Sequence, residues 1–155
     1  MAEFSSTQIS GLAASPKTKV QPYDTGSPQI LVASTPAVAA WANGDTFVIG
    51  FIPKGSRILR SGKLWHGAFG ASVTMTIGVR DAVTKTAINA AGLLASASVA
   101  TAGLVKNIDT GALLNQTGGY VTTADVEVYA TLAGADPTDN IQAEFEIPYL
   151  TSSVT

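Results

Sequence analysis

The sequence predicts an all-β protein: an antiparallel β-sandwich, jelly-roll-like, preceded by an extended N-terminal arm. Apolar residues recur at every second position in 46–52, in 72–80 and in 141–149, which is typical of strands with one buried face. Glycine, proline and asparagine separate these stretches at short intervals, as turns do in sandwiches and barrels. No stretch carries a long helical period, which argues against an α/β fold. An up-and-down barrel is the alternative.

The first 28 residues differ from the rest. They are polar, have no sustained period, and carry prolines at positions 16, 22 and 28, which exclude a helix or a central strand. We expect residues 1–28 to be an extended arm that becomes ordered on a neighbouring subunit, a loose terminus being the alternative. Its expected contact residues are Phe4, Ile9, Leu12 and Tyr23. The sandwich domain is expected at 29–150, followed by a polar C-terminal tail at 151–155.

The first half of the domain predicts four strands. They are expected at Ile30–Ala33, Thr46–Ile52, Ser56–His66 and Ser72–Arg80. The third is expected to bend or bulge at Gly62, because a glycine inside a strand often marks such a site. Pro36–Gly44 reads as a loop.

The second half is less regular. Residues 82–116 have neither the two-residue period of a strand nor the 3.6-residue period of a helix. We expect a long irregular segment with one helical turn in the alanine-rich part around 90–102 and one or two short strands. Tyr120–Leu132 and Ile141–Tyr149 are expected to pair as a hairpin across the turn formers of 134–140. Pro148 indicates either an edge position or a strand end.

Alternation also predicts one side of the sandwich interior. The expected core residues are Phe47, Ile49, Phe51, Val73, Met75, Ile77, Phe145 and Ile147.

The composition limits the possible partners. Only 13% of the residues are charged and the formal net charge is −2, so nucleic-acid binding is not expected. Sparse charge favours packing against other subunits, since interface cores are depleted in charge; an unremarkable soluble surface is the alternative. The chain has no cysteine, no apolar run long enough for a membrane helix, and an N-terminus unlike a signal peptide. No membrane partner is expected.

No catalytic or metal-binding constellation is found, so we expect no enzyme activity, no cofactor and no metal. His66 is the single histidine and is expected to pack or to lie at an interface. Glu144 and Glu146 share one face of a strand, which fits a solvated or intersubunit surface better than glycosidase chemistry. The loop 136–140 is expected to be a plain turn rather than a Ca²⁺ site.

One basic cluster stands out around a turn and the strand after it. It consists of Lys54, Arg57, Arg60 and Lys63. This cluster predicts a contact with an acidic surface of a partner or of another subunit, or else a charged edge that protects against aggregation.

The pattern of turns and strands resembles a family. The pattern consists of Gly44-Asp45-Thr46, then Ile52-Pro53-Lys54-Gly55-Ser56-Arg57-Ile58-Leu59, the Thr-rich strand Val73–Val79, and the late segments Gly119-Tyr120, Ala135–Asn140 and Ile141–Tyr149. It is similar to the pattern of small structural proteins of tailed-bacteriophage virions. The resemblance covers about 44–150 and matches least over 82–116. It implies a capsid decoration (cement) protein on the outer capsid surface of the virion. Its implied partner is the major capsid protein, and its implied state is a homo-oligomer, with a trimer favoured, that stabilises the capsid by bridging capsomers.

Two other functions stay open at this point. One is a phage tail or fibre component. The other is a carbohydrate-binding module, for which the plausible aromatic platforms are Trp41, Trp65, Tyr120 and Tyr129.

Overall fold

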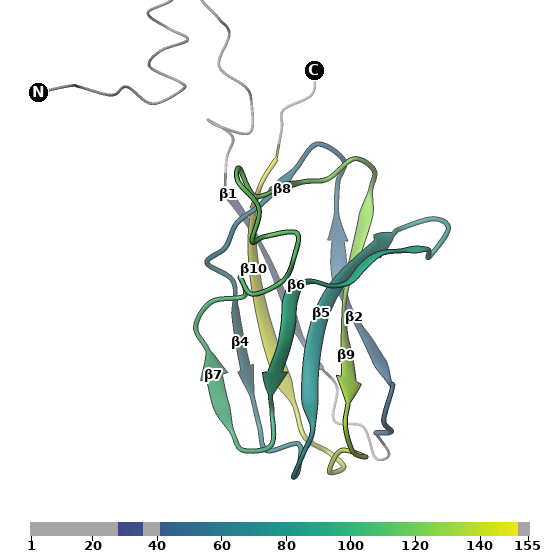
Figure 1. Ribbon diagram of the computed structural model, residues 1–155, viewed down its shortest axis with the longest axis vertical. Helices are drawn as coiled ribbons and strands as arrows, with labels where there is room; N and C mark the ends of the chain where they lie inside the picture. The colour runs from purple at the N-terminus through teal and green to yellow at the C-terminus, as the bar shows by residue number, and fades with distance from the viewer. Residues whose placement is uncertain (1–27, 36–40, 152–155) are drawn as a thin grey trace, which may run out of the picture.

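The computed structural model describes residues 28–35 and 41–151, and every statement below concerns these ranges. They form ten strands and no helix (Figure 1). The strands are β1 (Pro28–Ser34), β2 (Thr46–Ile52), β3 (Arg57–Ile58), β4 (Lys63–His66), β5 (Thr74–Asp81), β6 (Ala87–Ser98), β7 (Gly103–Val105), β8 (Tyr120–Val121), β9 (Val126–Ala133) and β10 (Ala143–Leu150). The four expected arm contacts, Phe4, Ile9, Leu12 and Tyr23, lie outside the described residues.

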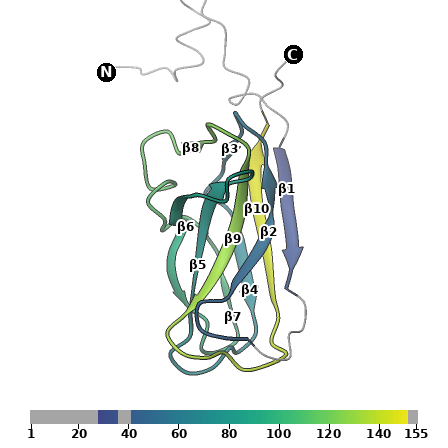
Figure 2. The same ribbon diagram turned by 90° about the vertical axis from the view of Figure 1, so that its right-hand side faces the viewer.

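The strands make two antiparallel sheets packed face to face. The larger sheet has the order β7-β4-β10-β3-β8, with β1 paired to the other edge of β10; the smaller has the order β2-β9-β5-β6. Apart from the short β3 and β8, each sheet therefore has four strands whose chain order gives the doubled Greek key of a jelly roll. The predicted jelly-roll-like sandwich is confirmed. Figure 2 shows β1 at the margin of the molecule.

The core is the apolar layer between the sheets. Seven of the eight expected core residues are buried or half-buried there, and the rings of Phe47 and Phe145 stack with centroids 5.8 Å apart. An enclosed pocket beside these two rings has a volume of about 10 Å³, which is at most the space of one water molecule. The interior is filled by side chains, and this pocket has no room for a ligand.

Phe51 is the exception, and its placement in the core was wrong. Its side chain is 58% exposed, whereas its neighbours Ile49 and Ile52 are buried. The pairing of β2 with β9 shifts register between Val48 and Gly50, so a bulge moves the alternation by one residue. Such a slip turns the following side chains to the opposite face.

The expected third strand is interrupted rather than bent. Its first part is β3 and its second part is β4, and both pair with β10. Gly62 lies in the break, where its carbonyl accepts a hydrogen bond from Ile108 N (2.8 Å). The loop that follows β7 therefore fills the space at the break.

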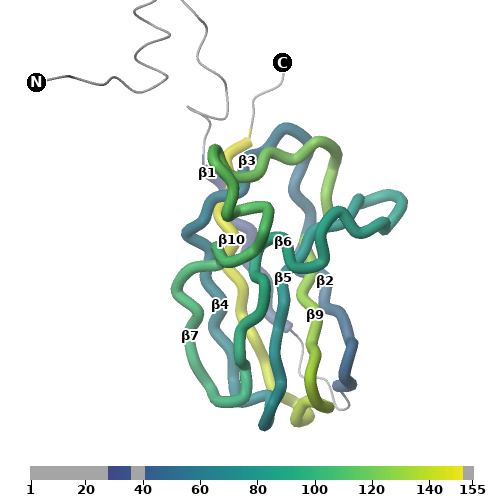
Figure 3. The backbone as a smooth tube through the Cα atoms, in the orientation of Figure 1, coloured from purple at the N-terminus to yellow at the C-terminus, as the bar shows by residue number. Residues whose placement is uncertain are grey.

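The expected helical turn around 90–102 was also wrong, because most of this segment belongs to β6, the longest strand. Register shifts in the β5–β6 pairing explain why no two-residue period was visible in the sequence. The backbone of Gly111 lies against that of Gly92, so closely that a Cβ at Gly111 would come within 2.2 Å of Gly92. Gly111 belongs to the segment between β7 and β8, whose path Figure 3 shows.

The predicted hairpin of the last two strands does not form. The first of them splits into β8 and β9, which belong to different sheets, and β9 pairs with β2 and β5. β10 lies inside the larger sheet, so the edge position for Pro148 was wrong as well. The carbonyl of Pro148 faces the break between β3 and β4 and accepts from Leu59 N (2.9 Å). The missing N–H faces the same break, because both groups of one residue point the same way.

We predict that Phe145→Ala lowers the free energy of unfolding by about 3–5 kcal/mol, because a fully buried ring that stacks on Phe47 is lost. The matched control is Phe51→Ala, which should cost less than about 1 kcal/mol, since that ring is mostly exposed. Urea titration of both variants measures the difference. Equal losses would contradict the assignment of inner and outer faces.

Candidate interaction surfaces

The residues that the sequence offered as candidates for catalysis or metal binding do not form a site. His66 is buried on β4, with Nδ1 3.0 Å from the carbonyl oxygen of Gly67, so it packs inside the sandwich. Among the described residues, no group of three or more His, Cys, Asp or Glu side chains is placed to hold a metal ion. In the same part of the chain, no helix is long and apolar enough to cross a membrane.

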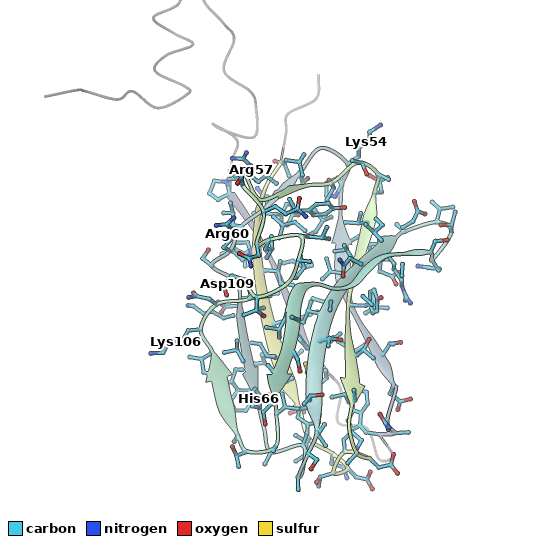
Figure 4. The ribbon with its side chains drawn as sticks, viewed as in Figure 1. Lys54, Arg57, Arg60, His66, Lys106 and Asp109 are labelled. Atoms are coloured by element: carbon cyan, nitrogen blue, oxygen red, sulfur yellow. The ribbon has the colours of Figure 1, made fainter. Side chains whose placement is uncertain are left out.

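The four basic residues of the sequence cluster lie in three different places. Figure 4 shows Lys54 apart from Arg57 and Arg60. Arg57 and Arg60 line one open cleft, together with Gly118 and Gly119. Lys54 lines a different cleft, beside the β5–β6 hairpin. Lys63 lies on β4 and pairs with Glu146 at 3.7 Å, both side chains being more than half exposed. The sequence neighbours thus do not form one basic patch.

The outer face of the larger sheet carries apolar side chains at both margins. On β1, Ile30 and Val32 are 62% and 66% exposed. At the far margin, Trp65 of β4 and Leu104 of β7 are cross-strand partners and are also exposed. Isolated exposed apolar residues are ordinary, but here they recur on one sheet face, which is a common property of protein interfaces.

The middle of this outer face is charged. Glu144 is in register with Trp65, and Glu146 is in register with both Lys63 and Val32, so all of them share one face. The Lys63–Glu146 pair is solvated and contributes little to stability. No ion pair within the described ranges involves Glu144. Glu144 and Glu146 are both exposed, so the outer face of β10 is the solvated or intersubunit face that the alternation predicted.

The β1 edge has a further property. β1 pairs with β10 on one side only, and its sequence Pro28–Ser34 contains no charged residue. Soluble proteins usually protect such edges with lysine, proline or bulges. Pro28 occupies the first position of β1, and the rest of this uncharged edge is suited to burial against another chain.

The outer face of the smaller sheet carries a hairpin fixed by a buried carboxylate. Glu127 of β9 has a side chain only 2% exposed, and both Arg80 of β5 and Lys85 of the hairpin pair with it. Arg80 also stacks over the ring of Tyr129 at 4.7 Å, and Lys85 over the ring of Phe51 at 5.4 Å. The hairpin, which projects sideways in Figure 1, is thereby anchored to β9 and β2.

The charges on this face shift two pKa values. Burial raises the pKa of Glu127, but the hydrogen bonds and charges of Lys85 and Arg80 outweigh it, so the pKa lies below its ordinary value of 4.5. The backbone N–H groups of Thr84 and Val83 donate to Asp81 and lower its pKa as well. Both carboxylates are therefore held ionised, and they shape the hairpin.

Apolar residues surround the anchored hairpin. Val83 at its tip is almost fully exposed, and a cleft of about 330 Å³ lies at its base. Phe51, Ile52, Pro53, Ala82 and Asp125 line that cleft. Sequence reasoning missed this surface, because Phe51 was expected inside and the hairpin lay in the irregular region. The only sequence signal was Asp81 followed by Thr84, which suits a turn closed by side-chain hydrogen bonds.

The aromatic residues proposed for carbohydrate binding do not form a platform. Trp41 and Tyr129 are buried, and the Tyr120 hydroxyl is buried without a hydrogen-bond partner. Trp65 is the one member of the four that is substantially exposed. These four residues therefore do not make an exposed row of aromatic rings.

The fold is shared with chains of three phage capsids. The match to "Capsid of Ralstonia phage GP4" has a TM-score of 0.66 at 14% sequence identity and covers 83% of this chain and 87% of that chain. The match to "Cyanophage Pam1 capsid asymmetric unit" has a TM-score of 0.56 at 19% identity and covers 81% of this chain and 85% of that chain. The match to "Acidic stable capsid structure of Helicobacter pylori bacteriophage KHP30" has a TM-score of 0.52 at 16% identity and covers 84% of this chain and 93% of that chain. Each similarity spans most of both chains, so the matched chains are close to this one in length. No protein-family model and no curated protein matches the sequence.

We predict that Glu127→Gln destabilises the protein by about 1–3 kcal/mol at neutral pH, because Arg80 and Lys85 lose their shared carboxylate. The lowered pKa of Glu127 means that its stabilisation is complete above about pH 4.5 and is lost as the pH falls through the folded-state pKa. Thermal unfolding between pH 7 and acid measures this. The variant should lose less stability on acidification than the wild type.

The matched control is Asp139→Asn, which removes an exposed carboxylate of the loop after β9 that takes part in none of the ion pairs described above. Its stability should follow that of the wild type at every pH. Parallel pH profiles for Glu127→Gln and the wild type would contradict the role assigned to Glu127.

Proposed function

We propose that this chain is a capsid decoration protein of a tailed bacteriophage. It binds the outer surface of the capsid, contacts the major capsid protein, and stabilises the particle by bridging capsomers as a homo-oligomer, with three copies favoured. The observation that carries this proposal is the similarity of the whole domain to chains of phage capsids over most of both lengths. Because fold and function are separable, the surface has to support the proposal independently.

The surface gives that support in two ways. The described part of the chain has a filled interior, and its clefts bring together no set of catalytic groups. Exposed apolar residues instead lie on both outer faces and on the uncharged β1 edge. Such features suit a protein that works by being covered by other chains. Its action is structural and needs no cofactor.

Repeated weak contacts are enough for this function. When one copy of an oligomer binds, the contacts of the other copies become intramolecular, so the overall affinity exceeds that of each contact. A ligand that binds only the assembled lattice stabilises that lattice by mass action. The arm, with Phe4, Ile9, Leu12 and Tyr23, supplies an additional contact with a neighbouring subunit in this proposal.

We predict that capsids carrying the protein release their genome at a higher temperature than capsids stripped of it, because the bound form holds neighbouring capsomers together. Heating both particle types with a fluorescent nucleic-acid dye measures the release temperature. Identical temperatures, with the protein found on the tail, would favour a tail or fibre component. Binding on a glycan array would instead favour the carbohydrate-binding module.

A second prediction concerns the arm. Deleting residues 1–27, which spares β1, should weaken attachment to capsids at least about tenfold while the domain stays folded. Co-sedimentation with capsids measures attachment, and circular dichroism confirms the fold. The control replaces the same residues with a Gly/Ser segment of equal length. If the truncated protein binds as tightly as the intact one, the arm has no role in attachment.

A further inference from the structure

The free edge of β1 presents a row of backbone hydrogen-bonding groups. Directly after β1, Thr35 N donates to Ala143 O (2.8 Å), so the odd-numbered residues of this register direct their N–H and C=O groups toward β10. The even-numbered residues Ile30, Val32 and Ser34 therefore direct theirs away from it. Within the described ranges β1 pairs with no other strand, and Figure 2 shows it at the margin of the molecule. This edge can accept one more strand.

The side chains of β1 are apolar and uncovered on the outer face, and they are held from the inside. Ile30 and Val32 are 62% and 66% exposed. Between them, Leu31 points inward, where its Cδ1 would lie 2.6 Å from a Cβ at Gly50 of β2. The domain therefore fixes the strand through β10 and β2 while its outer side stays open to a partner.

Acidic side chains lie beside these apolar ones. Val32 is in register with Glu146 and Ser34 with Glu144, so both carboxylates are on the outer face, one strand away from the free edge. Glu146 shares a solvated pair with Lys63, while Glu144 belongs to no ion pair in the part of the chain that the structure describes. A strand added to β1 would therefore be favoured by basic side chains on its outer face.

The sequence before β1 contains a segment that matches this edge. Residues 17–21 (KTKVQ) lie outside the described residues and are bounded by a proline on each side. The segment itself contains neither proline nor glycine, and its β-branched residues Thr18 and Val20 alternate with Lys17 and Lys19. The two lysines are the only basic residues among the first 27.

We propose that residues 17–21 of a second copy add to the free edge of β1 as a further strand of the larger sheet. Their lysine stems lie along Ile30 and Val32, and their ammonium groups reach the carboxylates of Glu144 and Glu146. Two strand spacings, about 10 Å, separate the added strand from β10, and a lysine and a glutamate side chain together span that distance. Backbone hydrogen bonds supply the affinity, and the charges select the segment.

The connection to β1 is unsuited to the same pairing within one chain. A hairpin that aligned Gln21 with Ile30 would need a loop of eight residues, 22–29, whereas hairpin loops usually have about two to five residues. A parallel pairing would need a crossover of about a dozen residues or more. A contact between two different parts of identical chains can close into a ring, which is compatible with the favoured trimer. The inference deepens the arm contact and the homo-oligomer of the proposed function and rests on them.

A proline substitution on β1 tests the edge. Val32→Pro removes an N–H that points away from β10, and edge strands tolerate proline at such positions, so the domain should stay folded. Self-association should weaken at least about tenfold, because an intermolecular hydrogen bond is lost and the ring obstructs the added strand. Sedimentation velocity over a concentration series measures the association. The matched control, Val32→Thr, keeps the N–H and the β-branch and should associate as the wild type does.

A second proline substitution tests the other half of the contact. Val20→Pro leaves the domain unaltered and should weaken self-association as much as V32P does, because it interrupts the added strand. The double variant V20P/V32P should be no weaker than either parent, since both changes remove the same contact. If V32P proves unstable in thermal unfolding, V20P decides the test.

The lysines are tested by charge reversal. K17E/K19E should weaken self-association, because like charges then face the outer carboxylates. Salt should weaken the association of the wild type more than that of this variant. The matched control K54E/K106E reverses two exposed lysines away from the β1 edge and should associate as the wild type does.

The inference is overturned if the wild type is monomeric, if V20P associates normally, or if V20P/V32P is weaker than both of its parents. Normal association of a folded V32P together with reduced binding to capsids would mean that a capsid strand occupies the edge, which also overturns it. A monomeric wild type that still raises the release temperature of capsids would overturn this contact and leave the proposed function standing.

Discussion

The apolar layer between the two sheets is the interaction on which the rest of the structure depends. The stacked rings of Phe47 and Phe145 join the two sheets, and the inward side chains of β5, β9 and β10 fill the layer without room for a ligand in its enclosed pocket. Burial of this layer is the main favourable contribution to folding. Because it takes the inward face of every long strand, only outer faces, edges and loops are available for function.

The outer surfaces of both sheets combine few charges with exposed apolar residues. Charge is sparse, and where it is concentrated it either fixes shape, as Glu127 does with Arg80 and Lys85, or lies on the outer face of β10. Exposed apolar residues accompany both arrangements, and the β1 edge carries no charge. These properties are costly for a chain that stays alone in water and useful for one that is covered by neighbours. The proposed decoration role accounts for them together.

Sequence reasoning succeeded where a strand follows strict alternation and failed where pairing is not local. β5 and β10 were predicted closely, because each keeps a two-residue period. The partner of β10 was not predictable, since a sandwich sends the chain from β9 in one sheet to β10 in the other. Bulges hid β6 and moved Phe51 outward. The basic residues illustrate the same limit, because a turn and a strand break carry Lys54, Arg60 and Lys63 to three separate surfaces.

A reconstruction of the virion by electron cryomicroscopy tests the central claim most directly. The account predicts density that fits this jelly roll on the outside of the shell, in many copies, with the copies of one oligomer touching more than one capsomer. Imaging particles with and without the protein identifies that density by its absence from the second sample. Density confined to the tail, or to the inner surface of the shell, would contradict the account.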